Sequence, residues 1–136
     1  MRRYFACIGI GNLLWEIAQL PLYTLWRTGT AREIAFAVLH CTGGDLLIAA
    51  CALILALVLA GDARWPAAAF QRVAILTLVL GVGYTIFSEW LNILVRKSWA
   101  YSAAMPLVPW LDVGLSPLLQ WIFIPLGALL LARRAR

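Results

Sequence analysis

The chain has 136 residues, of which 64% are hydrophobic and 12% are charged, and its net charge at pH 7 is +5. An ordinary soluble domain is about 45–50% apolar and about 25% charged, so this composition excludes a soluble domain and indicates an integral membrane protein. Because a membrane span needs roughly 20 residues, the length fits one domain of four spanning helices. The basic residues lie at the ends of apolar segments, which argues against nucleic-acid binding and favours contacts with membrane lipids.

The first predicted helix covers about residues 4–26 and carries a stripe of polar side chains on one narrow face. These side chains are Asn12, Glu16, Gln19 and Tyr23. The stripe is expected to face the interior of the bundle, because a carboxylate near the middle of a membrane must be paired, protonated or hydrated. Pro21 predicts a kink in the outer third of this helix.

The second predicted helix, residues 31–60, begins with Thr30 and Glu33 in the arrangement of a capping box. Within it, His40 and Asp45 interrupt a long apolar segment. A charged side chain at the centre of a span costs about 2.5–3.5 kcal/mol, so the default interpretation is a functional or pairing site. At about 100° per residue, the two side chains lie about 140° apart and are expected to contact different neighbours.

The third predicted helix, residues 67–95, is apolar until it reaches Glu89 and Asn92 near its end. The connection that follows is aromatic and rich in proline, and it includes Trp99 and Tyr101. Such a segment is typical of the membrane interface and is expected to cover the mouth of the bundle.

The fourth predicted helix covers residues 116–132. Ser116 and Pro117 form a suitable start, since proline is favoured at the first helical position. The helix carries one interior polar residue, Gln120, in its first half. The predicted fold is therefore all-α, a four-transmembrane-helix bundle.

Basic residues predict the orientation of this bundle. Seven lie on the side that holds both termini, namely Arg2, Arg3, Arg64, Arg72, Arg133, Arg134 and Arg136. Four lie on the opposite side, namely Arg27, Arg32, Arg96 and Lys97. By the positive-inside rule, both termini are expected in the cytoplasm, which leaves the aromatic connection on the outer side.

Helix geometry then places four ionisable side chains as a column in the outer half of the bundle. The candidate catalytic residues are Glu16, His40, Asp45 and Glu89. The candidate substrate-binding residues are Asn12, Gln19, Tyr23, Asn92, Trp99, Tyr101 and Gln120. We expect an outward-facing polar pocket, in which a membrane-embedded enzyme or ligand-binding protein acts by acid–base chemistry on a lipid-like molecule that enters laterally.

Several alternatives fit the same residues. His40, Asp45 and Glu89 could hold one divalent metal ion, or His40 with a carboxylate and Arg96 with Glu89 could be structural pairs. The protein could instead be an accessory subunit of a larger membrane complex, a homo-oligomer, or a component of a proton-coupled transporter. The sequence contains no serine-centred motif, phosphate-binding loop or Cys-x-x-Cys, which leaves hydrolase, nucleotide-dependent and thiol-redox activities unsupported.

Three sequence segments resemble those of a family of small, uncharacterised four-helix bacterial membrane proteins. They are Trp15-Glu16-Ile17-Ala18-Gln19-Leu20-Pro21-Leu22-Tyr23, His40-Cys41-Thr42-Gly43-Gly44-Asp45 and Ser88-Glu89-Trp90-Leu91-Asn92. The resemblance extends into residues 99–120 and so covers most of the chain. It implies the four-helix fold and a bacterial inner membrane, and it implies no activity.

Overall fold

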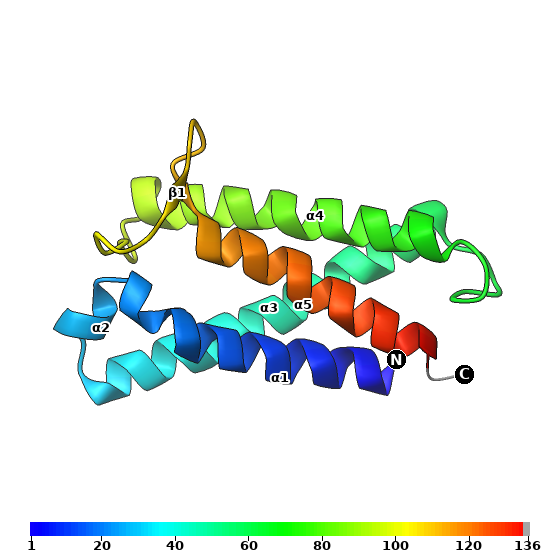
Figure 1. Cartoon of the computed structure of the whole chain (residues 1–136), viewed down its shortest axis with the longest axis horizontal. Helices are drawn as coiled ribbons and strands as arrows, with labels where there is room; N and C mark the ends of the chain where they lie inside the picture. The colour runs from blue at the N-terminus through cyan, green and yellow to red at the C-terminus, as the bar shows by residue number, and fades with distance from the viewer. Residues whose placement is uncertain (135–136) are drawn as a thin grey trace.

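Four helices of the protein are long and apolar enough to cross a membrane, and they form one bundle (Figure 1). The computed structural model describes residues 1–134. The four candidate spans are Arg2–Leu22, Ala31–Ala60, Phe70–Val95 and Leu115–Arg134. The first begins and the last ends at one end of the bundle, which we call the terminal end; the opposite end carries a small β-hairpin, and we call it the hairpin end (Figure 1). The prediction of a mainly helical protein with four long apolar helices is confirmed.

Helix α1 (Arg2–Gln19) stops earlier than predicted. Pro21 has no N–H to donate and its ring clashes with the preceding turn, so it belongs to a new element instead of kinking the helix. The chain continues through a 3-10 turn, η1 (Leu20–Leu22), and a one-turn helix, α2 (Leu25–Thr28). The predicted kink is therefore wrong, and Tyr23 lies beyond the helix in extended backbone.

Helix α3 (Ala31–Ala60) has the predicted bounds. The Thr30 side chain accepts a hydrogen bond from the backbone N–H of Glu33 at 3.3 Å, and the Glu33 side chain accepts one from the backbone N–H of Thr30 at 2.8 Å. This capping box satisfies N–H groups that the first turn cannot pair internally. At the other end, Gly61 leaves the helix in extended backbone.

Helix α4 (Phe70–Trp90) continues into a π-helical turn, η2 (Leu91–Val95). It begins later than the predicted residue 67 because turns and bends occupy the link up to residue 69. After η2, the chain forms a short antiparallel hairpin of β1 (Leu107–Val108) and β2 (Val113–Gly114). Helix α5 (Leu115–Arg134) then returns to the terminal end and extends slightly past both predicted bounds.

The aromatic connection between α4 and α5 is attached to the link that follows α1. Tyr101 and Tyr23 form an isolated antiparallel bridge, and the Thr24 N–H donates to the carbonyl of Ala100 at 2.9 Å. Met105 is buried beneath the hairpin. The connection is thus a folded cover over the hairpin end of the bundle.

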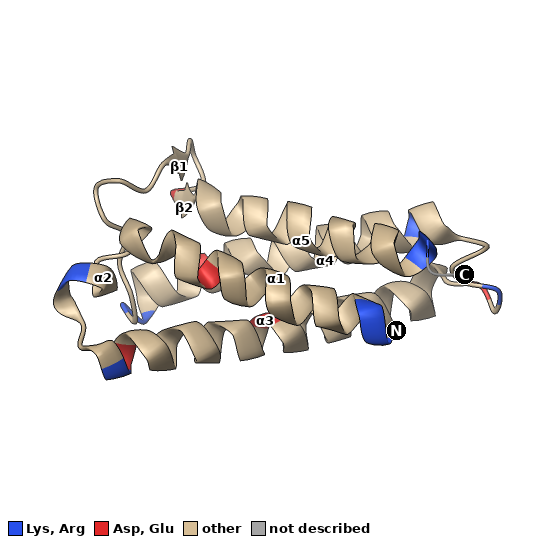
Figure 2. Ribbon diagram, turned by 60° about the horizontal axis from the view of Figure 1, so that its bottom comes forward, with Lys and Arg blue, Asp and Glu red and all other residues tan. Residues whose placement is uncertain are grey.

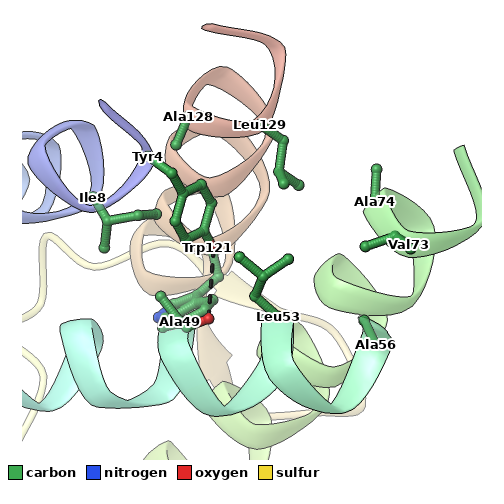
Figure 3. Close-up of a cluster of buried hydrophobic side chains, with 10 residues drawn as sticks. All are labelled: Tyr4, Ile8, Ala49, Leu53, Ala56, Val73, Ala74, Trp121, Ala128 and Leu129. Carbon is green, nitrogen blue, oxygen red and sulfur yellow. Dashed lines mark hydrogen bonds between the residues drawn. The ribbon is translucent and has the colours of Figure 1, made fainter. Parts of the chain in front are cut away.

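The apolar core fills the terminal half of the bundle, and Figure 3 shows how its side chains lie against one another. Tyr4, Leu53 and Leu129 come from three helices and are completely buried. Alanines such as Ala49 and Ala128 lie between them, and small side chains of this kind let helices approach closely. Packing therefore joins the helices in this half.

Basic residues lie at both ends of the bundle and are absent from the described middle of the four helices (Figure 2). The terminal end holds Arg2, Arg3, Arg64, Arg72, Arg133 and Arg134, whereas the hairpin end holds Arg27, Arg32, Arg96 and Lys97. Arg136, which the orientation prediction also counts, lies outside the described residues.

Candidate functional site

A single side-chain amide joins three helices in the interior of the bundle. The Nε2 atom of Gln120, on α5, donates to the Oε1 atom of Glu16 at 3.0 Å and to the Oδ2 atom of Asp45 at 3.1 Å. It also donates to the Oδ1 atom of Asn12 at 2.8 Å. An amide nitrogen carries two hydrogens, so the three acceptors must share them. The Gln120 amide nitrogen is therefore a shared hydrogen-bond donor to two acidic side chains from different helices.

A second amide extends the cluster toward the hairpin end. The Nε2 atom of Gln19 donates to the Oε1 atoms of Glu16, at 3.0 Å, and Gln120, at 3.1 Å. The Ser116 hydroxyl donates to the Oε1 atom of Gln19 at 2.8 Å, and the Trp15 indole N–H donates to that hydroxyl at 3.1 Å. We call five of these residues the carboxyl–amide network: Asn12, Glu16, Gln19, Asp45 and Gln120.

Asp45 is the acidic member of the network that lies deepest in the bundle. Its side chain is 8% exposed, and each of its oxygens accepts one hydrogen bond. Gln120 donates to Oδ2, and the indole N–H of Trp121 donates to Oδ1 at 3.2 Å. Trp121 also packs in the apolar core, so the same side chain borders both halves of the bundle (Figure 3).

Glu89, on α4, has a different partner from the other two acids. The Tyr101 hydroxyl donates to its Oε2 atom and accepts a hydrogen bond from the Gly114 N–H at 2.8 Å. The Trp99 side chain also lies against Glu89. Burial, together with the contact to Glu89, raises the pKa of Tyr101 above its ordinary range, so the phenol remains a donor at neutral pH. The aromatic connection thereby covers Glu89.

The three acids have no basic partner in the described part of the chain. Its one ion pair within contact distance joins Asp62 and Arg64 in the exposed link at the terminal end. Glu16, Asp45 and Glu89 lie close enough to interact with one another electrostatically. Neutral donors stabilise a carboxylate without cancelling its charge, so in an apolar interior such a cluster needs protons or a bound cation. The arrangement is suited to exchanging protons with a ligand.

Glu16 has one carboxylate oxygen without a hydrogen bond within the described residues, and α3 is open at Gly44, beside Asp45. Glu16 is partly exposed, and both amide hydrogen bonds fall on its Oε1 atom, whereas no described side chain donates to Oε2. A Cβ atom added at Gly44, next to Asp45 in the sequence, would meet no other atom within 4 Å. Open space therefore adjoins α3 at the level of the network.

The predicted column of four ionisable residues is assembled without its histidine. The structure brings Glu16, Asp45 and Glu89 together, but His40 is exposed, and its ring stacks on that of Phe36 with the centroids 5.4 Å apart. A helix of this kind turns one face inward; Asp45 occupies that face, and His40 lies about 140° away from it.

The predicted metal site of His40, Asp45 and Glu89 does not form for the same reason. Within residues 1–134, no group of three or more histidine, cysteine, aspartate or glutamate side chains could hold a metal ion. The residues present therefore do not fit the divalent metal ion that the sequence allowed.

The remaining predicted residues occupy the hairpin end. Asn92 is partly buried and donates to the carbonyl of Ser88, one turn earlier, at 2.9 Å. The Tyr23 ring lies 5.5 Å from that of Tyr101, and burial raises its pKa above the ordinary tyrosine range. Arg96, the alternative partner predicted for Glu89, is exposed.

Ser116, which the sequence assigns only to the start of a helix, lies at the site, and three further residues there were not predicted. Trp15 directly precedes Glu16 in the sequence, and Trp121 directly follows Gln120. Both tryptophans supply indole donors. Thr42 is buried one turn before Asp45 on the inward face of α3, and its hydroxyl has no hydrogen-bond partner among the described residues. Tryptophan next to a polar residue in an apolar segment is the signal that could have identified the first two.

Comparisons with known proteins add no relative: no family model, curated protein or solved structure matches the chain. The resemblance to small four-helix bacterial membrane proteins therefore stays a prediction.

Proposed function

We propose that the protein provides a membrane-embedded acid–base site for a lipid-like molecule. The observation that carries the proposal is the donation of one amide, Gln120, to both Glu16 and Asp45, with no basic side chain paired to either within the described residues. A bundle that needed only to fold would avoid such residues, because intramembrane acids are costly. Acids retained inside a membrane protein typically mark a ligand site or a proton relay.

Glu16 is the residue proposed to exchange the proton. Gln19 and Gln120 fix its Oε1 atom, and Oε2 is left for a ligand. A polar head group that reaches Oε2 would give its proton to the carboxylate or take one from the acid. Because Asp45 shares the Gln120 donor, a change of charge on Glu16 alters the hydrogen bond that Asp45 receives.

A lipid-like ligand is favoured by where the open space lies. Helices α3 and α4 are joined at the terminal end and diverge toward the hairpin end (Figure 1). The space beside Gly44 borders the side of a span, whereas the cover around Tyr101 occupies its end. A molecule already in the membrane would therefore reach Glu16 by lateral entry more readily than a water-soluble one.

The proposed location is a bacterial inner membrane, with both termini in the cytoplasm. Six basic residues of the described chain lie at the terminal end and four at the hairpin end. This difference favours a cytoplasmic terminal end. The carboxyl–amide network would then lie in the outer half of the membrane.

The experiment that tests the acid–base site compares bound molecules by native mass spectrometry of purified protein. We expect an amphiphile that copurifies with the unmodified protein and is lost from both Glu16→Gln and Asp45→Asn. His40→Ala is the matched control, since it removes an ionisable intramembrane side chain outside the network. The control should retain the amphiphile. Equal occupancy in all four proteins, or an empty unmodified protein, would contradict the proposal.

A second candidate function, an accessory subunit of a membrane complex, is favoured by the hairpin. Trp110 at its tip is 99% exposed, and Leu107 and Leu111 beside it are about half exposed. A partner that covers this tip would make a larger complex in native membranes. Trp110→Ser should abolish that complex on native electrophoresis while Glu16→Gln preserves it; a protein that migrates alone in every case would contradict this function.

A further inference from the structure

A cavity at the terminal end has no part in the proposed acid–base site. It is an open depression at the surface, where Arg72 and Arg133 are both exposed, and its volume of about 440 Å³ falls within the range of about 300–1,000 Å³ typical of ligand sites. The residues that line it are Ala67, Ala69, Phe70, Gln71, Arg72 and Arg133. Two of these are arginines, one from the first turn of α4 and one from the last turn of α5.

The two arginines have no acidic partner within ion-pair distance in the described chain. The Arg133 guanidinium lies 4.7 Å above the centre of the Phe70 ring. The attraction between the cation and the ring holds the guanidinium at this position, and its N–H donors remain able to bind an oxyanion. The cavity therefore presents two positive charges from different helices to one space.

The N-terminal end of α4 adds to the positive character of this cavity. Its first-turn N–H groups have no acceptor within the helix, and Ala69, at the N-cap, offers no side chain to cap them. No acidic residue lies in that first turn. The helix dipole places its positive end at the same position.

Asp62 is the acid that interacts with Arg72. Hydrogen bonds from the side chain and backbone of Arg64 hold the pKa of Asp62 below its ordinary range, so its charge is present at neutral pH. This carboxylate lies outside the lining of the cavity. It would weaken the binding of an anion modestly.

We infer that this cavity binds a phosphate group, carried by an anionic lipid or by the free ion. A pair of guanidinium groups matches the geometry and charge of phosphate oxygens. The apolar part of the lining, Phe70 with Ala67, and its place at the end of the spans favour the head group of an anionic lipid. The inference is independent of the acid–base site, which lies in the other half of the bundle.

The test uses the full-length protein in a neutral detergent, titrated with short-chain phosphatidylglycerol and followed by native mass spectrometry. We expect this lipid to bind at least about tenfold more tightly than phosphatidylcholine of the same chain length. Arg72→Gln and Arg133→Gln should each weaken its binding at least about fivefold, whereas Asp62→Asn should strengthen it. An unchanged thermal transition in detergent verifies that each variant is folded.

Arg3→Gln is the matched control, because Arg3 lies exposed at the same end and does not line the cavity. Its affinity for phosphatidylglycerol should be unchanged. Competition by inorganic phosphate would show that the site also accepts the free ion, and lack of competition would assign it to the lipid. Equal binding of the two lipids, or an equal loss in Arg3→Gln, would overturn the inference.

Discussion

The two halves of the bundle join the same four helices by different means. In the terminal half, apolar and small side chains such as Leu53 and Ala128 are completely buried against one another. In the hairpin half, amides, carboxyls and a phenol meet through hydrogen bonds. Lipid tails are as apolar as a leucine side chain, so no hydrophobic driving force holds membrane helices together. Close packing holds one half, and satisfied polar groups hold the other.

This difference determines how each half should respond to substitution. Removing atoms from the apolar half leaves a cavity, and its cost depends on how far the neighbours can close it. Removing a donor from the polar half leaves acceptors buried without a partner, which costs the desolvation of each one. The polar half should therefore be the more sensitive to a single well-chosen change.

The largest effect is expected from Gln120→Leu. The substitution preserves side-chain volume but removes the donor shared by Asn12, Glu16 and Asp45. We expect the free energy of unfolding to fall by about 3 kcal/mol, since several buried acceptors lose a partner at once. Unfolding in mixed detergent and denaturing micelles measures the change. Gln71→Leu, at an exposed position, should have almost no effect, and equal losses in the two variants would contradict the role of Gln120.

The next largest effect is expected from Leu53→Ala in the apolar half. Leu53 is completely buried between helices, so truncation leaves a void that lipid cannot fill. We expect a loss of about 2 kcal/mol, near the lower end of the range for buried leucines, because the transfer term is small when the surroundings are lipid. The same unfolding assay applies. Leu55→Ala, on the exposed face of α3, is the control; if it destabilises the protein equally, packing in this half is not specific.

A somewhat smaller loss is expected from Gly81→Ala, which tests the border between the halves. A Cβ atom at Gly81 would overlap the ring of Trp121, whose indole donates to Asp45. The ring would have to move, and we expect a loss of about 1–2 kcal/mol together with a change in tryptophan fluorescence. Gly83→Ala, where the added atom meets nothing within 4 Å, should instead stabilise the helix slightly. The same sign for both variants would mean that the Trp121 contact carries no energy.

Local signals in the sequence predict the secondary-structure elements well, but they do not predict the contacts between helices. The bounds of α3 follow from Thr30, Glu33 and Gly61, which act on their own neighbours. The effect of Pro21 is ambiguous in the sequence, because a proline either kinks or ends a helix. Here the helix ends, and the link that follows α1 is hydrogen-bonded to residues 100–102.

The candidate site was predictable in its acids and not in its partners. Periodicity placed Glu16 and Asp45 inward, since a helix in lipid turns its most polar face to its neighbours. Residue type places His40 at the same site, although its angle on the helix places it on another face. The central role of Gln120 depends on three helices meeting, and no spacing within one helix encodes that.

The smallest effect is expected from Tyr101→Phe, which separates the cover from the network beneath it. The change removes the hydroxyl that donates to Glu89 and accepts from the Gly114 N–H. We expect the free energy of unfolding to fall by about 1 kcal/mol, because these hydrogen bonds are only partly buried. Tyr84→Phe, at an exposed position on α4, should be neutral.

The pH dependence of this contribution distinguishes a hydrogen bond from simple packing of the ring. The folded protein raises the pKa of Tyr101 above that of the unfolded chain, mainly by burial and then by the contact with Glu89. The stabilisation is therefore fully present below the ordinary tyrosine value of about 10 and is lost as the pH rises above it. The difference in stability between the unmodified protein and Tyr101→Phe should thus be constant from pH 7 to about 9 and shrink at higher pH. A difference that persists unchanged in strong alkali would contradict this dependence on the phenol proton, and a difference near zero at every pH would mean that the ring, which both proteins keep, holds the aromatic cover against α4.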